Sequence, residues 1–279
     1  MRERRQALLL LAPALLVLLA LIALPQALMF EASLGQRSAF GGIVHGVQAG
    51  NYARALEPLY LTIFARSVWL ALLTTALTLL VGYPVAYWLA LVASPRFRNA
   101  LLALIVLPFW TSFLVRMYAW MFLLRSEGLV NMTLRALGLP ALELLYTPAA
   151  VLIGQVYGEL PFMVLPLFVA LEKLERSLLE AAADLGASPA RTLRHVTLPL
   201  TMPGIVAGCV LVFIPSLGAY LAPDLLGGAK TVYLGNLIQS QFAIARDVPF
   251  GAALAFLLSL LVLLLLLLFK RPLQAARLA

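Results

Sequence analysis

Apolar stretches of bilayer-spanning length constrain the fold of this chain more than any other feature of its sequence. A transmembrane helix needs about 20 consecutive, mostly apolar residues. Six stretches meet this requirement, at residues 7–30, within 67–94, about 99–124, about 147–171, about 200–222 and about 249–269. Because a helix satisfies its own backbone hydrogen bonds inside lipid, the sequence predicts an all-α, polytopic membrane protein with six transmembrane helices.

The composition excludes the soluble classes of protein. Hydrophobic residues make up 63% of the chain and charged residues 11%, whereas a soluble domain is about 45–50% apolar and about 25% charged. So few charges cannot cover a water-facing surface, which excludes a soluble enzyme, a secreted disulfide-stabilised protein and a disordered chain. Cys209 is the single cysteine, so no cysteine-based metal site is expected. The basic residues form no patch interleaved with aromatic residues, so no nucleic acid partner is expected.

The distribution of Lys and Arg predicts the orientation in the membrane. Cytoplasmic segments carry an excess of these residues, and an inside N-terminus places twelve of them on inner segments and seven on the longer outer loops. We therefore expect both termini in the cytoplasm. Arg2, Arg4 and Arg5 precede an apolar stretch longer than that of a signal peptide, and no small-residue cleavage site follows it, so this stretch is expected to remain as the first span.

A long inner loop, residues 172–199, separates the fourth and fifth stretches. Leu178–Leu185 consists mainly of strong helix formers, and Gly186 follows where a helix end needs a left-handed residue. Ser188–Pro189 has the residue types of an N-cap and a first helical position, and Pro199 either ends this second helix or begins the next span. The loop is thus predicted to form two short helices that meet at a glycine elbow. Shape alone leaves open a surface hairpin without a partner.

The residues of this loop resemble the EAA motif of ABC importer permease subunits. Glu180-Ala181-Ala182 is followed after three residues by Gly186, and after nine more by Val196-Thr197-Leu198-Pro199. Val196 is the one departure, since the family pattern has Ile at that position. The resemblance implies a type I ABC importer transmembrane domain, MetI-like in fold. On this likeness, the residues that couple the chain to the ATPase are Glu180, Ala181, Ala182, Gly186, Arg191, Leu193, Val196 and Pro199.

The same resemblance implies the roles of these residues and the partners of the chain. Glu180 is expected to face a basic residue of the ATPase, and Leu193 and Val196 to anchor the loop, while Arg191 either contacts the ATPase or stays solvated. The implied partners are an ABC ATPase dimer, a second homologous permease subunit, an extracytoplasmic substrate-binding protein and the lipid bilayer. The implied location is the bacterial inner membrane. The whole chain, 1–279, is expected to be one permease domain with its core at about 61–270.

No cofactor is expected on this chain, which is expected to be a transport subunit rather than an enzyme. A nucleotide-binding P-loop needs the pattern G-x-x-x-x-G-K-[ST]. The nearest run, Gly227–Thr231, has Ala before its Lys and lies on the predicted outer side. ATP and Mg are therefore expected on the partner ATPase.

Further segments are similar to the spermidine/putrescine permease branch of this family, the PotB type. They include Gly82–Tyr87, Leu107–Thr111, Leu160–Leu167 and Pro223–Gly228, in the same order along the chain. The likeness extends over about residues 50–260 and implies a polyamine or a related small cationic amine as the substrate. Permeases for other small solutes share many of these motifs, so a different solute remains an alternative.

Two charges interrupt the predicted spans, Arg116 in the third and Glu159 in the fourth. A charge near the bilayer centre costs about 2.5–3.5 kcal/mol on insertion scales, so it is expected to face protein or a water-filled cavity. At 1.5 Å per residue both lie at similar depth, about 12 Å and about 18 Å from the outer side. They are expected either to form a structural ion pair or to leave Glu159 on the substrate path. A protonated, buried Glu159 is a third alternative.

If Glu159 attracts an ammonium group, aromatic rings are expected to assist it by cation–π contact. The candidates for the substrate path are Glu159, Tyr157, Trp120, Tyr220 and Asp224, the last at the outer mouth of the path or simply a turn residue. The rival from another class is an ion-coupled secondary transporter or channel that uses Glu159 and Arg116 as a relay. A membrane-embedded hydrolase is disfavoured, since neither H-E-x-x-H nor G-x-S-x-G occurs, and no metal or catalytic residue is expected.

Overall fold

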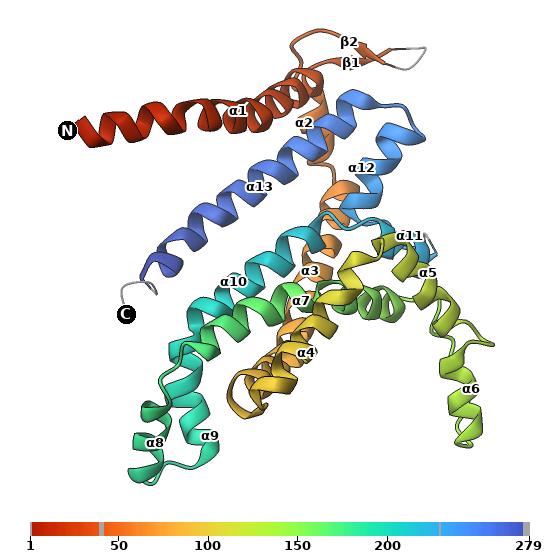
Figure 1. Cartoon of the computed structure of the whole chain (residues 1–279). Coiled ribbons are helices and arrows are strands. Elements are labelled where there is room, and N and C mark those ends of the chain that lie inside the picture. The colour runs from red at the N-terminus through yellow and green to blue at the C-terminus, as the bar shows by residue number, and fades with distance from the viewer. Residues whose placement is uncertain (1, 39–41, 229, 276–279) are drawn as a thin grey trace. The chain divides into compact units, whose positions relative to one another are not determined.

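The computed structural model describes residues 2–38, 42–228 and 230–275, so Arg277, used in the orientation argument, lies outside the described residues. The described chain is almost entirely helical (Figure 1), which confirms the predicted fold class. The helices group into two compact units that interleave along the chain. Unit 1 comprises Met1–Thr62 and Leu237–Val262, and unit 2 comprises Ile63–Asn236 and Leu263–Ala279. The sequence predicted a single permease domain, and this stays a prediction.

The elements follow one another in this order: α1 (Arg2–Ser33), β1 (Gln36–Arg37), β2 (Ile43–Val44), α2 (Gly50–Ala55), α3 (Pro58–Tyr87), η1 (Trp88–Val92), α4 (Pro95–Val106), η2 (Leu107–Trp110), α5 (Phe113–Leu124), α6 (Leu129–Ala136), α7 (Pro148–Glu172), α8 (Arg176–Asp184), α9 (Pro189–Thr192), η3 (Leu193–Thr197), α10 (Leu198–Leu217), α11 (Leu221–Gly227), α12 (Leu234–Ala243) and α13 (Val248–Ala275). The strands β1 and β2 form a two-stranded antiparallel hairpin in the loop after α1. The sequence had predicted no strand there.

Unit 1 is held together by contacts between its N-terminal part and α13. Phe30 of α1 packs on Phe256 of α13 with 5.0 Å between ring centroids. Arg54 of α2 forms an ion pair with Asp247, which directly precedes α13, at 2.8 Å from Nη1 to Oδ2. The Arg54 guanidinium also lies 3.9 Å from the centroid of the Phe250 ring. Burial lowers the pKa of Arg54, but its hydrogen bonds to Asp247 and Tyr60 more than offset this, so the pKa is raised overall.

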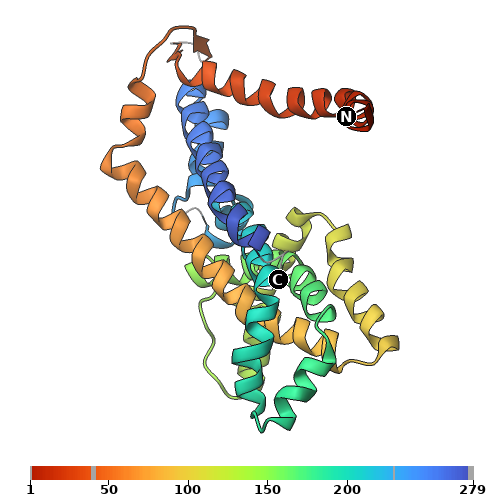
Figure 2. The same cartoon turned by 90° about the vertical axis from the view of Figure 1, so that its left-hand side faces the viewer.

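Helix α7 is the centre of unit 2. Thr147 caps its start by accepting a hydrogen bond from the Ala150 N–H at 3.3 Å. Helices α7 and α10 lie side by side in both views of the fold (Figures 1 and 2). Their close approach depends on Gly208 of α10, where an added Cβ would lie 2.7 Å from the Met163 sulfur. Lipid offers no hydrophobic driving force between helices, so small residues that let helices pack closely are the expected solution.

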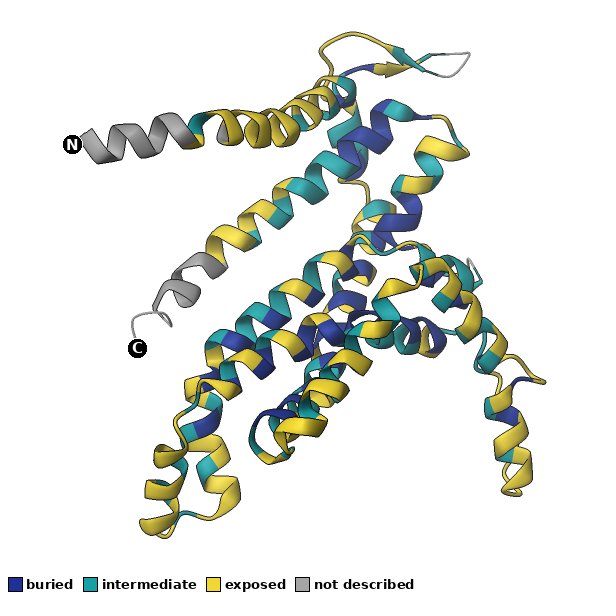
Figure 3. Ribbon diagram, in the orientation of Figure 1, coloured by how far each residue is buried: buried dark blue, intermediate teal, exposed yellow. Residues whose placement is uncertain are grey.

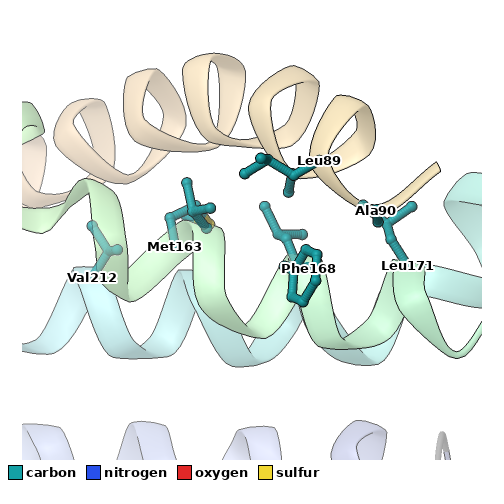
Figure 4. Packing of buried hydrophobic residues seen from close by; sticks show 9 residues of the cluster. Leu89, Ala90, Met163, Phe168, Leu171 and Val212 are labelled. Carbon is teal, nitrogen blue, oxygen red and sulfur yellow. The ribbon is translucent and has the colours of Figure 1, made fainter. Parts of the chain in front are cut away.

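Two apolar clusters form the core of unit 2, one toward each end of α7. The Met163 cluster comprises Ala86, Leu89, Ala90, Met163, Val164, Leu167, Phe168, Leu171 and Val212 (Figure 4). The Met117 cluster comprises Leu70, Met117, Leu124, Ala150, Val151, Ala222, Leu226 and Tyr233. The buried residues along α7 stand out in Figure 3, whereas most of the α8–α9 segment is exposed.

The third predicted span, residues 99–124, is not one straight helix. Its two parts, Pro95–Trp110 and Phe113–Ala136, are bent by 98° at the break between them. Pro108 lacks a backbone N–H and fixes its own φ angle, and Thr111 and Ser112 adopt extended backbone angles, with ψ of 148° and 138°. The described chain therefore has five helices long and apolar enough to cross a membrane, or six if the bent pair counts as one span.

Pro199 does not end the helix that begins at Pro189. The helical run continues from Pro189 to Leu217 and passes through the π-type turn η3 just before the proline. A proline inside a helix cannot donate to the carbonyl four residues earlier and clashes with it. The wider hydrogen-bonding step of a π turn accommodates this conflict, so the helix that carries the fifth span begins at Pro189, before the predicted residue 200.

Candidate functional sites

Helices α8 and α9 form the predicted hairpin, with Gly186 as its elbow. The φ of Gly186 is +75°, in the left-handed region where glycine carries no steric penalty. The Gly186 N–H donates to the Ala183 carbonyl at 2.8 Å and the Ala187 N–H to the Ala182 carbonyl at 3.0 Å. These two bonds make up a Schellman motif. The spacing of Ala182 and Gly186 in the sequence is therefore the spacing that this helix end requires.

The α8–α9 hairpin exposes apolar side chains at its tip. Leu185, the residue before the elbow, is 89% exposed, and Leu178 and Leu193 are 42% and 36% exposed. Among the predicted coupling residues, two are half-buried, Ala182 and Val196, and six are exposed: Glu180, Ala181, Gly186, Arg191, Leu193 and Pro199. Exposed large apolar groups on a charged hairpin are typical of an interaction surface. Sequence reasoning missed Leu185, although its position at a helix C-cap beside an exposed elbow prevents it from packing inside.

Two contacts tie the neighbourhood of this hairpin to the other helices of unit 2. Arg98 of α4 forms an ion pair with Glu172, the last residue of α7, at 3.1 Å from Nη1 to Oε1. Tyr83 of α3 and Thr201 of α10 share a hydrogen bond of 3.0 Å between their hydroxyl oxygens. Glu172 precedes the hairpin in the sequence and Thr201 follows it. The Arg98 contact therefore connects the start of the hairpin to α4, and the Tyr83 contact connects its end to α3.

The two charges predicted in the membrane do not form a direct ion pair. Among the described residues, none of the ion pairs within 4.0 Å involves Arg116 or Glu159. The Arg116 guanidinium instead lies 4.7 Å from the centroid of the Phe109 ring and 5.3 Å from that of Phe113. Glu159 is 7% exposed, and its Oε2 has no hydrogen-bond partner. The guanidinium thus lies against rings on both sides of the break between η2 and α5.

The candidate aromatic residues fall into two places in unit 2. The rings of Trp120 and Tyr157 meet edge to face with 5.5 Å between centroids, which joins α5 to α7. Tyr220 and Asp224 instead belong to the start of α11. There the side-chain amide of Asn236 donates to the Asp224 carboxylate and, at 3.0 Å, to the Tyr220 carbonyl. Asp224 thus has a structural partner that sequence reasoning missed.

Besides Glu159, five buried polar side chains among the described residues have an atom without a hydrogen-bond partner, and two of them are Thr197 and Asn236. The other three lie within long helices: Thr74 of α3, Gln155 of α7 and Ser216 of α10. No sequence motif marked them, since isolated Thr, Gln and Ser are common in membrane helices. In the described part of the chain no group of three or more His, Cys, Asp or Glu side chains is arranged to hold a metal ion.

Residues 82–275 match the family described as binding-protein-dependent transport system inner membrane component. The chain is 46% identical over 223 residues to the spermidine/putrescine transport system permease protein PotB of Salmonella typhimurium (strain SL1344), covering 79% of this chain and 77% of that protein. It is 41% identical over 252 residues to PotB of Haemophilus influenzae, covering 90% and 88%.

Solved structures share the fold of the chain. A bacterial ABC transporter involved in the import of the polysaccharide alginate superposes with a TM-score of 0.74 at 17% identity, covering 98% of this chain and 96% of that chain. The same transporter in complex with an alginate pentasaccharide-bound periplasmic protein gives a TM-score of 0.68 at 19% identity, with the same coverage. These likenesses confirm the predicted fold of a type I ABC importer transmembrane domain.

Proposed function

Because the chain belongs to the family of binding-protein-dependent transport system inner membrane components, we propose that it is the permease subunit of an ATP-driven importer of spermidine, putrescine or a related small cationic amine. The spermidine/putrescine transport function of its relatives at 41–46% identity supports the choice of substrate. The chain is a transport subunit, not an enzyme. Nothing in its family favours the alternative of an ion-coupled secondary transporter.

The α8–α9 hairpin is the observation that carries the mechanism. Its Schellman elbow holds two short helices at a defined angle, and its exposed Leu185 and Leu193 offer an apolar surface to a partner. We propose that this surface docks on the ATPase, with Glu180 facing a basic residue there. Closure of the ATPase dimer on ATP then moves the hairpin, and the contacts at its base pass that movement to the spans of unit 2.

The remaining partners follow from the same proposal. A second homologous permease subunit completes the path, and an extracytoplasmic binding protein delivers the amine from the side opposite the hairpin. This arrangement requires both termini of the chain on the cytoplasmic side of the bacterial inner membrane, as the Lys and Arg distribution predicts. Alternating access between the two sides imports the amine without changing it chemically.

We propose that Glu159 lies on the path and attracts the ammonium group. Its buried Oε2 has no partner inside the chain, and the aromatic pair Trp120 and Tyr157 joins α5 to the helix that carries Glu159. Aromatic faces and a carboxylate together attract a cation. The ring contacts of Arg116 favour a scaffold role for that residue, since a guanidinium on the path would repel the substrate.

Isolation of the complex tests this function. The tagged chain is purified from gently solubilised native membranes, the co-purifying proteins are identified, and the complex is reconstituted in vesicles with ATP and the binding protein. We expect an ATPase and a second permease to co-purify, and labelled putrescine or spermidine to enter the vesicles only with ATP. A chain that is isolated alone refutes the importer assignment, and a complex that hydrolyses ATP but takes up no polyamine refutes the substrate.

A further inference from the structure

Thr74, Gln155 and Ser216, named here the polar layer, are almost completely inaccessible and incompletely hydrogen-bonded. Their exposed fractions are 0%, 1% and 2%. The Oγ1 of Thr74, the Nε2 of Gln155 and the Oγ of Ser216 each lack a partner. Buried polar groups in proteins are nearly always paired, and one left unpaired is costly. Unpaired buried atoms also occur in the same unit at Arg98, Arg116, Glu159, Thr197 and Asn236. Thr74, Gln155 and Ser216 are the neutral members that lie within three long helices, and such a set calls for a functional explanation.

The three side chains lie at a similar depth. Gly82 of α3 and Gly208 of α10 both face Met163 of α7. Counted along each helix, Thr74, Gln155 and Ser216 all lie eight residues from that contact, or about 12 Å at 1.5 Å per residue. All three lie toward the same end of unit 2, since α3 and α7 run in one direction and α10 runs back from the hairpin.

The hydroxyl groups of the polar layer differ from neighbouring threonines on the same helices. Thr75 and Thr78 of α3 and Thr201 of α10 each donate to the carbonyl four residues earlier, at 2.7 Å. This bond is the usual way for a hydroxyl in a membrane helix to satisfy itself. Thr74 and Ser216 do not make it, so their oxygens remain free for another partner.

Glu159 lies one helical turn from Gln155 on the same face of α7, since residues four apart are neighbours on a helix. Its unpaired Oε2 adds a charged acceptor beside the neutral ones. Rotation of the Gln155 amide presents an oxygen instead of the nitrogen, because both ends of an amide can take part in hydrogen bonds. The layer can therefore offer three neutral oxygen acceptors next to one carboxylate.

We propose that Thr74, Gln155 and Ser216 form a neutral binding layer for an ammonium group that approaches or leaves Glu159. An ammonium group donates three hydrogen bonds, and three neutral oxygens replace the water that it loses on entering the helix bundle. Neutral ligands hold a cation less tightly than a carboxylate does, and transport requires binding that still permits release. This inference rests on the proposed function, since it assigns the site to an amine substrate.

The test uses the complete importer in vesicles with its binding protein, and labelled putrescine as the substrate. The variants Thr74→Val, Gln155→Leu and Ser216→Ala keep the size of each side chain approximately and remove its hydrogen-bonding atoms. We expect each to lower putrescine uptake at subsaturating concentration about tenfold, the range for a hydrogen bond to a charged group. ATP hydrolysis stimulated by the loaded binding protein reports assembly, and uptake is expressed relative to it.

Thr75→Val is the matched control, because Thr75 is also buried, makes its own backbone bond and lies one residue from Thr74. Uptake by this variant should stay within about twofold of the wild type, and Thr74→Ser should restore uptake. Ser216→Ala removes a single atom and serves if the larger replacements prevent assembly.

If the polar layer is only structural or only contacts water, the result differs. Replacement of an unpaired buried polar atom by an apolar isostere then leaves the complex equally or more heat-stable, because the desolvation penalty is removed, and uptake stays unchanged. That outcome overturns the polar layer as an amine site. A second readout is the ratio of putrescine uptake to uptake of an N-methylated analogue that has fewer N–H groups. This ratio is compared between each variant and the wild type with the same binding protein, so that the selectivity of the binding protein cancels. Failure of the proposed function is visible in the wild type, whereas failure of the layer is visible only in the variants.

Discussion

Replacement of Gly186 by valine tests whether the α8–α9 hairpin couples ATP hydrolysis to transport. An added Cβ at Gly186 meets no atom within 4 Å, so the substitution causes no clash. Its effect comes from the backbone, because φ is +75° and a left-handed conformation costs a residue with a Cβ roughly 1–2 kcal/mol. A difference of this size changes the population of the native elbow by about 5–30-fold.

The expected result is a complex that reaches the membrane and hydrolyses ATP but takes up several-fold less substrate per ATP. The assay measures both rates in the same vesicles that contain the full importer and its loaded binding protein. Only the ratio of uptake to hydrolysis is interpreted, because it is independent of the amount of complex incorporated.

Gly138 provides a control with the same backbone geometry elsewhere in the chain. Its φ is +73°, an added Cβ there also meets nothing within 4 Å, and the same pair of bonds closes the end of α6, from Gly138 to Arg135 and from Leu139 to Leu134. Gly138→Val should therefore carry equal strain without uncoupling, and Gly186→Asn should be tolerated because Asn adopts this conformation more easily. Unchanged uptake per ATP in Gly186→Val refutes the coupling role of the hairpin.

Three further predictions concern the path and the packing. Glu159→Gln keeps the shape of the side chain and removes its charge, so polyamine uptake should fall about tenfold or more while stimulated ATP hydrolysis persists; normal uptake would make Glu159 a scaffold residue. Arg54→Met leaves the buried Asp247 without its Arg54 partner, and the complex should lose about 1 kcal/mol of stability. The loss is this small because Arg54 is 40% exposed and its ion pair is partly screened. It is measured as a lower melting temperature of the solubilised complex. An unchanged melting temperature would show that the pair contributes nothing. Gly208→Leu forces a side chain against Met163, where even a Cβ would lie 2.7 Å from the sulfur, and should cost about 1–3 kcal/mol, measured as a lower melting temperature and less protein in the membrane. Wild-type levels would contradict the close packing of α7 and α10.

Local sequence signals predicted the hairpin well. A helix end with a left-handed residue and a helix start with proline depend on residues only a few positions apart, so Gly186 and Ser188–Pro189 were sufficient to predict α8 and α9. The predicted cap at Ser188 is present in backbone geometry, although its side chain makes no capping hydrogen bond. The fourth span was placed within one residue, because Thr147 and Pro148 mark its start.

Signals that depend on distant residues were harder to interpret. The sequence contains Pro108, but a proline in a membrane helix is compatible with either a mild kink or a complete break. The 98° bend is seen only in the tertiary structure, where α5 packs on α7 and α11. Arg116 and Glu159 have similar depths in their spans, yet depth says nothing about which way each side chain faces. The rings of Phe109 and Phe113 hold the guanidinium instead.

Taken alone, the sequence determined that the chain is a helical membrane protein with a two-helix hairpin, because hydropathy and helix-end chemistry act over a single turn or a single span. The ABC permease type of that hairpin followed from its resemblance to the EAA motif. The tertiary structure decided the rest: the central place of α7 between Gly82 and Gly208, the missing ion pair, and the unpaired atoms of Thr74, Gln155 and Ser216. These features depend on how three helices pack, and a side chain's partners are set by neighbours that lie far away in the sequence.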